Sequence, residues 1–249
     1  MNSFGKWVAL TLLVLGSALA FSAEMPEVPV RAESWETLHS LQDGNGRFSS
    51  GRIAHPHAKP QRRTQIAHEQ RPKAVVLSCS DSRVPPELIF DQGLGDLFTV
   101  RTAGHVLGAG TVASIEYAIS QLNSNLIIVM GHESCGAVKA ALAAPPQNSS
   151  PLESGTPLSY DLEKLLSKIR PNIKDFVGQK VEATLQGPVR ANVEGTIKQL
   201  LERSDLIRIA VKEGRLMIVP AIYHLSGGHV EFWQVGKKKQ KPLLQFRKK

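Results

Sequence analysis

Short apolar segments without regular alternation recur along the chain, at residues 74–77, 97–100, 126–130 and 216–223. All four predict strands, and the segments 74–77 and 126–130 are typical of strands that are buried on both faces, as in a parallel sheet. Helices are predicted between them, at residues 108–122, at 134–143, and in a later region where four residues share one face: Val193, Ile197, Leu200 and Leu201. This alternation predicts an α/β fold with a mostly parallel central sheet flanked by helices.

The pattern changes toward both ends of the chain. Ser34 is predicted to cap a helix that continues to about Gln42, and the turn residues at 43–46 are expected to end it. The polar segment 51–71 indicates loop and surface helix. Residues 144–159, rich in Pro, Ser and Gly, predict a surface loop. Near the C-terminus, Ser226-Gly227-Gly228 predicts a hairpin turn into an antiparallel edge strand at 229–233.

Length and charge restrict the class of protein. A chain of 249 residues suits one α/β domain, which we assign to residues 21–236. The formal net charge of +8 is concentrated in a basic tail, residues 237–249, which holds seven Lys and Arg and no acid. The rest of the chain is close to neutral, so a basic surface for nucleic acid is absent and no nucleic-acid partner is predicted.

The first twenty residues are typical of a secretory signal. Lys6 precedes an apolar run from Trp7 to Ala20, which ends in the small-residue site Ala18-Leu19-Ala20. The run is too short to span a bilayer core of about 30 Å comfortably, although an uncleaved anchor is the alternative. We therefore predict cleavage after Ala20, with Ala23 as the alternative site. We also predict no stable membrane insertion afterwards, and export to a bacterial periplasm or secretion.

The two cysteines lie directly after predicted strands. Cys79 follows the segment 74–77, and Cys135 follows the segment 126–130 together with His132. In an oxidising compartment an even pair first suggests a disulfide. However, open α/β sheets place their binding crevices at the carboxyl ends of the strands. Two cysteines and one histidine are a known catalytic zinc set, with a fourth position for water or for Asp81.

The segment from Cys79 to Arg83 and the later His132-Glu133-Ser134-Cys135-Gly136 together resemble the β-class carbonic anhydrases. The similarity covers nearly the whole mature chain and includes Gly44 to Phe48, Asp91 to Arg101 and Tyr223 to Gly228. It departs at Thr102 and His105, where many members have Asn at one or both positions. The ordered pair of motifs around the cysteines is the specific part of the resemblance.

The resemblance implies a zinc lyase that interconverts carbon dioxide and bicarbonate. One zinc ion per subunit would be held by Cys79, His132 and Cys135, and zinc-bound hydroxide would attack carbon dioxide with help from Asp81 and Arg83. It also implies a homodimer or a dimer of dimers, with the active sites near the subunit interface. An N-terminal helical arm carrying the stripe from Trp35 to Leu41 would wrap the partner subunit.

Physical chemistry assigns a compatible task to the acid and the arginine. Two thiolates cancel the formal charge of zinc, so an acceptor for the proton of bound water would help to keep that water deprotonated. Asp81 suits this task if Arg83 keeps it ionised and oriented. If Asp81 instead turns onto the metal as a fourth ligand, the site is closed. A plain surface ion pair, contributing about 0–1 kcal/mol, is the alternative for these two residues.

Other functions remain open at this stage. A related zinc protein could hydrolyse carbon disulfide or carbonyl sulfide, and a zinc ion held by the same residues could be purely structural. A non-catalytic exported protein would join Cys79 and Cys135 in a disulfide. A binder of nucleic acid or membrane surfaces would act through its basic tail. Outside the cluster, we interpret Glu133 as a solvated group or one that supports the ligands from outside, and three histidines as structural: His105, His224 and His229.

Overall fold

The structure is a computed structural model that describes residues 30–143 and 160–235. The predicted signal at 1–20, the predicted loop at 144–159 and the basic tail at 237–249 lie outside the described residues. Within the described ranges, no helix is both long and apolar enough to cross a membrane.

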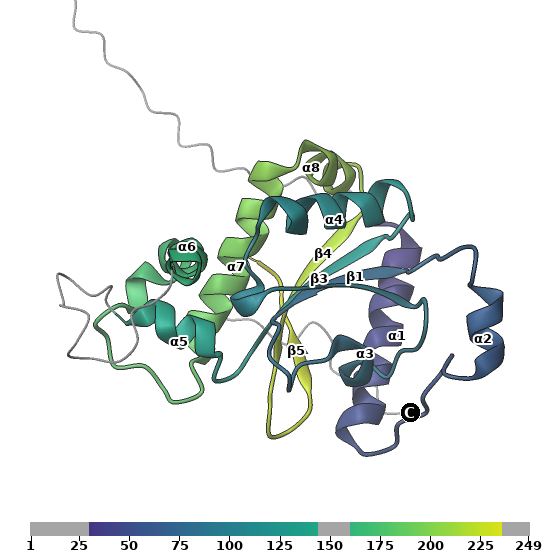
Figure 1. The fold of residues 1–249 in the computed structure, drawn as a ribbon, viewed down its shortest axis with the longest axis horizontal. Helices are drawn as coiled ribbons and strands as arrows, with labels where there is room; N and C mark the ends of the chain where they lie inside the picture. Colours follow the sequence, from purple (N-terminus) through teal and green to yellow (C-terminus); the bar gives the residue numbers. More distant parts are fainter. Residues whose placement is uncertain (1–29, 144–159, 236–249) are drawn as a thin grey trace, which may run out of the picture.

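A central sheet of five strands, shown in Figure 1, confirms the predicted fold class. The spatial order is β2-β1-β3-β4-β5; the first four strands are parallel, and β5 pairs antiparallel with β4. Each strand coincides with a predicted segment to within two residues at either end: β1 (Ala74–Ser78), β2 (Leu97–Arg101), β3 (Leu126–His132), β4 (Met217–Tyr223) and β5 (Val230–Phe232). The unbroken apolar segments of β1 and β3 are buried along their whole length.

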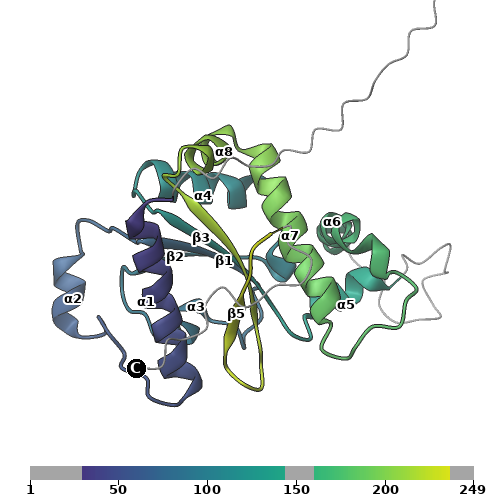
Figure 2. The ribbon, with the colours of Figure 1, turned by 180° about the vertical axis from the view of Figure 1, so that it is seen from behind.

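Helices cover both faces of the sheet (Figure 1, Figure 2). Side chains along a strand point alternately to the two faces, so Val75 and Leu77 enter one apolar core and Ala74 and Val76 the other. The Ala74 side is covered by α1 (Ala32–Ser49) and α3 (Pro86–Ile89). The Val75 side is covered by five helices: α4 (Ala109–Ser120), α5 (Gly136–Leu142), α6 (Tyr160–Ile169), α7 (Gln186–Arg203) and α8 (Asp205–Lys212). Two 3-10 turns, η1 (Ala103–His105) and η2 (Arg170–Phe176), adjoin this second layer, while α2 (Pro60–Gln65) has no buried residue.

The first helix is longer than its sequence suggests. It begins at Ala32, and Ser34 lies inside it with its hydroxyl donating to the Asn125 carbonyl, so the predicted cap is wrong. The predicted end at residues 43–46 is also wrong, because the helix continues to Ser49. Gly44 is needed for contact rather than for a turn: a Cβ there would lie 1.8 Å from the Phe90 carbonyl oxygen.

The contacts of Asn45 explain why α1 continues past the predicted turn at residues 43–46. Its side-chain amide donates to the carbonyls of Ile89 (3.0 Å) and Gly228 (2.9 Å), and its oxygen accepts from the Val230 N–H. These bonds join α1 to α3 and to the β4–β5 hairpin. The apolar stripe that we expected to wrap a partner subunit also packs within the chain, since Leu38 and Leu41 are buried against the sheet.

Candidate metal centre

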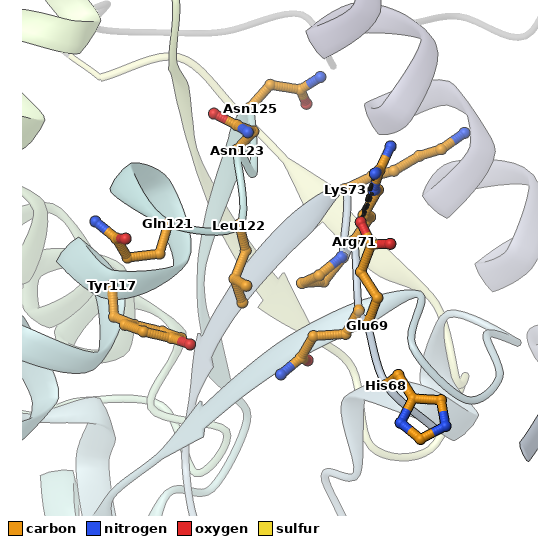
Figure 3. Close-up of a pocket in the computed structure, with 11 residues that line it drawn as sticks. His68, Glu69, Arg71, Lys73, Tyr117, Gln121, Leu122, Asn123 and Asn125 are labelled. Atoms are coloured by element: carbon orange, nitrogen blue, oxygen red, sulfur yellow. Dashed lines mark hydrogen bonds and ion pairs between the residues drawn. The ribbon is translucent and has the colours of Figure 1, made fainter. Parts of the chain in front are cut away.

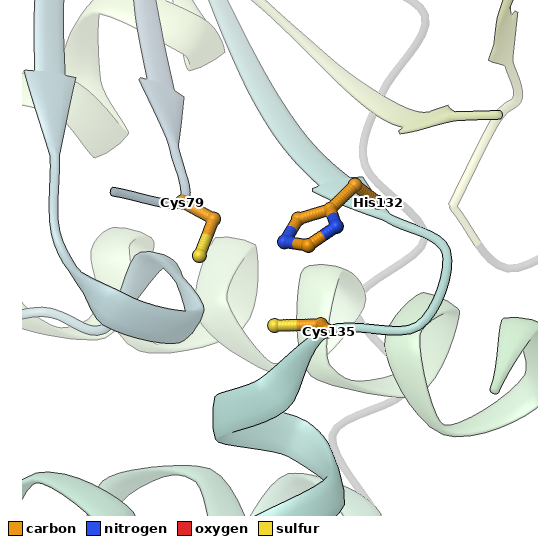
Figure 4. Close-up of side chains that lie close together, drawn as sticks. All are labelled: Cys79, His132 and Cys135. Atoms are coloured by element: carbon orange, nitrogen blue, oxygen red, sulfur yellow. The ribbon is translucent and has the colours of Figure 1, made fainter. Parts of the chain in front are cut away.

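Three buried side chains converge at the carboxyl end of the sheet, as Figure 4 shows. Cys79 directly follows β1, His132 is the last residue of the adjacent β3, and Cys135 precedes the first residue of α5. The parallel pairing of Ser78 with Met130 brings these strand ends together. One ligand atom from each of the three residues lies within 4.8 Å of the others, as predicted from the motif positions.

His132 is oriented as a metal ligand. Its ring is fully buried, and Nδ1 lies 2.8 Å from the Glu133 carbonyl oxygen, which can only accept. The proton is therefore on Nδ1, and Nε2 carries a lone pair. That Nε2 has no hydrogen-bond partner within the described part of the chain. A buried imidazole nitrogen without a partner next to two sulfurs fits a bound metal ion.

The two cysteines are free thiols and influence each other strongly. The Cys135 thiol lowers the pKa of Cys79 to about 3, against the effect of burial, and the Gly104 N–H, 3.3 Å from Cys79 Sγ, also lowers it. The same contact and burial raise the pKa of Cys135, because a second thiolate would be repelled by the first. A divalent cation would remove this repulsion, so the donor set fits zinc.

Asp81 and Arg83 form a tight ion pair beside the cluster. The Arg83 Nε and backbone N–H donate to Asp81 Oδ1 (both 2.9 Å), and Nη2 donates to Oδ2 (2.7 Å). Arg83 thereby lowers the pKa of Asp81 to about 2. Asp81 Oδ2 lies 3.8 Å from His132 Nε2, so the carboxylate borders the three ligand residues while remaining bound to Arg83.

Arg101 is a site residue to which the sequence analysis gave no role. It ends β2, pairs in register with Ser78, and donates to the carbonyls of Cys79 (3.0 Å) and Asp81 (2.6 Å). It therefore fixes the backbone that carries both side chains. The segment that resembles the family includes Arg101, but only the register between β1 and β2 shows what its guanidinium contacts.

Of the two interpretations of Glu133, the structure agrees with the second: the side chain is buried rather than solvated, and it supports the ligand loop from outside. Burial alone would raise its pKa, but donors from three places lower it. These donors are Gln186 Nε2 (2.9 Å), His224 Nδ1 (2.7 Å) and the Leu225 N–H (3.1 Å). Through Glu133 the loop between two metal-ligand candidates is attached to α7 and to the β4–β5 hairpin.

The three histidines interpreted as structural make contacts within the fold. His105 is buried beside Asn192, and burial lowers its pKa to about 4, which keeps it neutral. His224 pairs with Glu133, and its ring stacks on that of His229 at 4.1 Å between centroids. None of these three imidazoles belongs to the metal-ligand cluster found among the described residues.

A separate surface pocket of about 720 Å³ lies at the opposite edge of the sheet (Figure 3). Its lining includes Lys73 and Asn125, which precede β1 and β3, so it opens at the amino ends of these strands. The three ligand residues follow the carboxyl ends of the same strands. The pocket is therefore not part of the metal centre.

Comparisons with known proteins agree with this geometry. The family model for carbonic anhydrase matches residues 74–230. A carbonic anhydrase of Mycolicibacterium smegmatis is 42% identical over 193 residues, covering 77% of this chain and 89% of that protein. Carbonic anhydrase 2 of Mycobacterium tuberculosis is 40% identical, with 76% and 87% covered. The solved β-carbonic anhydrase CcaA is 30% identical, with a TM-score of 0.59 over 79% of this chain and 95% of that one.

Proposed function

Because the chain belongs to the β-carbonic anhydrase family, we propose that it catalyses the reversible hydration of carbon dioxide at a zinc ion held by Cys79, His132 and Cys135. The observation that carries this proposal is the convergence of these three buried donors beside Asp81. Family membership supports the reaction, and the donor atoms support the metal. When bound, zinc supplies Lewis-acid activation of water near neutral pH.

The residues in and around the candidate metal centre have separate tasks in this reaction. The two sulfurs and His132 Nε2 would hold the metal. Asp81 would accept a hydrogen bond from the reacting water at a carboxylate oxygen and orient that water toward carbon dioxide. Arg83 keeps Asp81 ionised and away from the metal through its three hydrogen bonds. Arg101 fixes the backbone that carries Cys79 and Asp81, and Glu133 fixes the loop between His132 and Cys135.

A second copy of the chain is the proposed partner. β2 is at one end of the sheet order, so its outer edge is unpaired within the described residues, and all five of its residues are only half-buried. Leu88 of α3 and Leu94 after it are exposed, and so is Tyr117, whose ring lies near that of Phe98 in β2. These features support a homodimer or a dimer of dimers. Light scattering on the purified protein tests this, and a monomer at micromolar concentration would contradict it.

Export of the mature chain is proposed from sequence alone. Residues 1–20 would be removed as a secretory signal, leaving a domain at 21–236 and a basic tail at 237–249. The test is N-terminal sequencing of protein recovered from the periplasm or the culture medium. A first residue at Phe21 supports cleavage after Ala20, whereas recovery of the full-length chain only from the cell interior contradicts export.

The reaction is tested by stopped-flow measurement of carbon dioxide hydration with zinc-quantified protein between about pH 6.5 and 9, a range that brackets a metal-activated water. We expect activity to increase with pH. Inactive protein with one zinc per chain and reduced thiols would contradict the proposal. In that case, turnover of carbonyl sulfide and carbon disulfide would identify the alternative substrates.

A further inference from the structure

A buried carboxamide of α7 contacts the turn next to the metal centre. Asn192 is 1% exposed, and its Nδ2 donates to the Gly104 carbonyl and to His105 Nε2, both at 3.0 Å. Its Oδ1 accepts from Asn172 Nδ2 at 2.9 Å. Asn192 is fixed in this orientation because the Gly104 carbonyl can only accept. The Nδ2 group therefore holds η1 against α7, and Oδ1 joins the same side chain to η2.

The surroundings of this contact admit little movement. Gly104 has φ of +63°, and a Cβ there would lie 2.6 Å from Ile169 Cδ1. On the other side of the network, Gly195 lacks a side chain where a Cβ would lie 2.3 Å from Asn172 Cγ. Gln199 completes the chain of amides by donating to Asn172 Oδ1 at 2.9 Å. The turn is thus held in one conformation by close packing and by a line of side-chain amides.

The same glycine donates to a proposed metal ligand. The Gly104 N–H lies 3.3 Å from Cys79 Sγ, and this contact is buried. A hydrogen bond to a thiolate stabilises its negative charge, so less of that charge is donated to a bound metal. Gly104 therefore connects Asn192, through its carbonyl, with Cys79, through its N–H.

We propose that Asn192 is a positioning residue that aims the Gly104 N–H at Cys79 and thereby keeps the bound metal a stronger Lewis acid than two unassisted thiolates would allow. The inference rests on the proposed function, because it takes Cys79 as a metal ligand. It adds a residue far from the motifs in sequence that acts on the metal through a backbone turn.

The test uses Asn192→Asp, which preserves shape but removes the Nδ2 donor, in the holoenzyme and in the cobalt-substituted enzyme. Without the donor, the thiolate gives more charge to the metal, so the sulfur-to-cobalt charge-transfer band moves to longer wavelength. We expect zinc to remain bound and kcat/KM to fall about tenfold to a hundredfold. The pH at which kcat/KM is half-maximal also increases, because the metal is a weaker acid.

The matched control is Lys198→Gln on the solvent side of the same helix, where the lysine contacts only Glu202 in the ion pairs of the described residues. In this variant the sulfur-to-cobalt charge-transfer band and the pH dependence of kcat/KM stay unchanged. If the aspartate variant does not fold, Asn192→Ser removes the amide without burying a charge. A variant that melts earlier but retains the wild-type band and pH midpoint overturns the proposal. Absence of a thiolate band in wild-type cobalt enzyme would instead refute Cys79 as a ligand, and with it the proposed function.

Discussion

Arg83 binds both carboxylate oxygens of Asp81, while Asp81 Oδ2 lies 3.8 Å from the free nitrogen of His132. The acid is therefore held between a cation that keeps it charged and the ligand cluster that it borders. An exposed ion pair two residues apart would ordinarily contribute little to stability. Its position beside three buried metal-ligand candidates supports the proposed role in chemistry instead.

Replacing Asp81 with Asn is expected to retain one zinc per chain and to lower kcat about a hundredfold or more, because the amide no longer provides a charged acceptor for the reacting water. The measurements are zinc content by atomic spectroscopy and stopped-flow hydration. Asp161→Asn, an exposed site on α6, is the control and should retain full activity. Wild-type kcat in the Asp81 variant would remove this residue from the mechanism.

Removing zinc is expected to make the cysteines vulnerable to oxidation. The sulfurs of Cys79 and Cys135 lie within 4.8 Å of each other, and the lowered pKa of Cys79 favours its thiolate form. With hydrogen peroxide as oxidant, two thiols give one disulfide and two water molecules. Thiol titration against time should show faster loss in chelated protein than in loaded protein. Equal rates would count against both cysteines as zinc ligands.

Alanine substitutions at the two glycines of α1 should change the free energy of unfolding in opposite directions. Gly44→Ala places a methyl group against the Phe90 carbonyl and should lower the free energy of unfolding by about 1–3 kcal/mol. Gly46→Ala has open space around its Cβ inside the same helix and should increase it by about 0.5–1 kcal/mol. Urea unfolding at one protein concentration measures both. Equal destabilisation would show that the close contact at Gly44 is not the cause.

Asp91 should stabilise the fold in a pH-dependent way. Its buried carboxylate accepts from Arg47 Nε and from the N–H groups of Ala54 and His55, and these bonds lower its pKa although burial opposes them. A carboxyl with a lowered folded-state pKa contributes stability above its unfolded pKa of about 3.9 and loses it as pH falls through the folded value. Asp91→Asn should therefore cost about 1.5–3 kcal/mol at pH 7.

The difference from wild type should stay constant from pH 7 to about 5 and shrink below about pH 4, since the wild-type carboxyl then becomes protonated as well. Urea titrations at these pH values measure it. Asp43→Asn, exposed on the same helix α1, serves as the control for the loss of one negative charge. A constant difference down to pH 3 would mean that the charge of Asp91 does not matter.

Local patterns predicted the sheet and the ligand cluster because both depend on short segments. The apolar segments of β1 and β3 are unbroken, and each is followed within a few residues by a ligand candidate. The parallel arrangement then places the strand ends side by side. The end of α1 was mispredicted because Gly44 and Asn45 are used for contacts with Phe90 and Gly228, which are distant in sequence.

Supporting residues were missed for a related reason. Asn192 lies in a helix with an ordinary apolar face, and nothing around it marks a contact with Gly104. Arg101 looks like the polar end of a strand until the register with β1 is known. Such residues act through long-range backbone contacts, which have no spacing signature in one sequence.

The parallel pairing of β1 with β3 also bears on when the three ligand candidates come together during folding. His132 and Cys135 are neighbours in the unfolded chain, whereas Cys79 joins them only when the strands pair across the crossover formed by β2 and α4. In an unfolded chain only His132 and Cys135 are kept close together, and the cluster of three donors is complete once β1 and β3 pair. Zinc would then bind late in folding, after the sheet has formed. A chain exported unfolded would take up its zinc on the far side of the membrane.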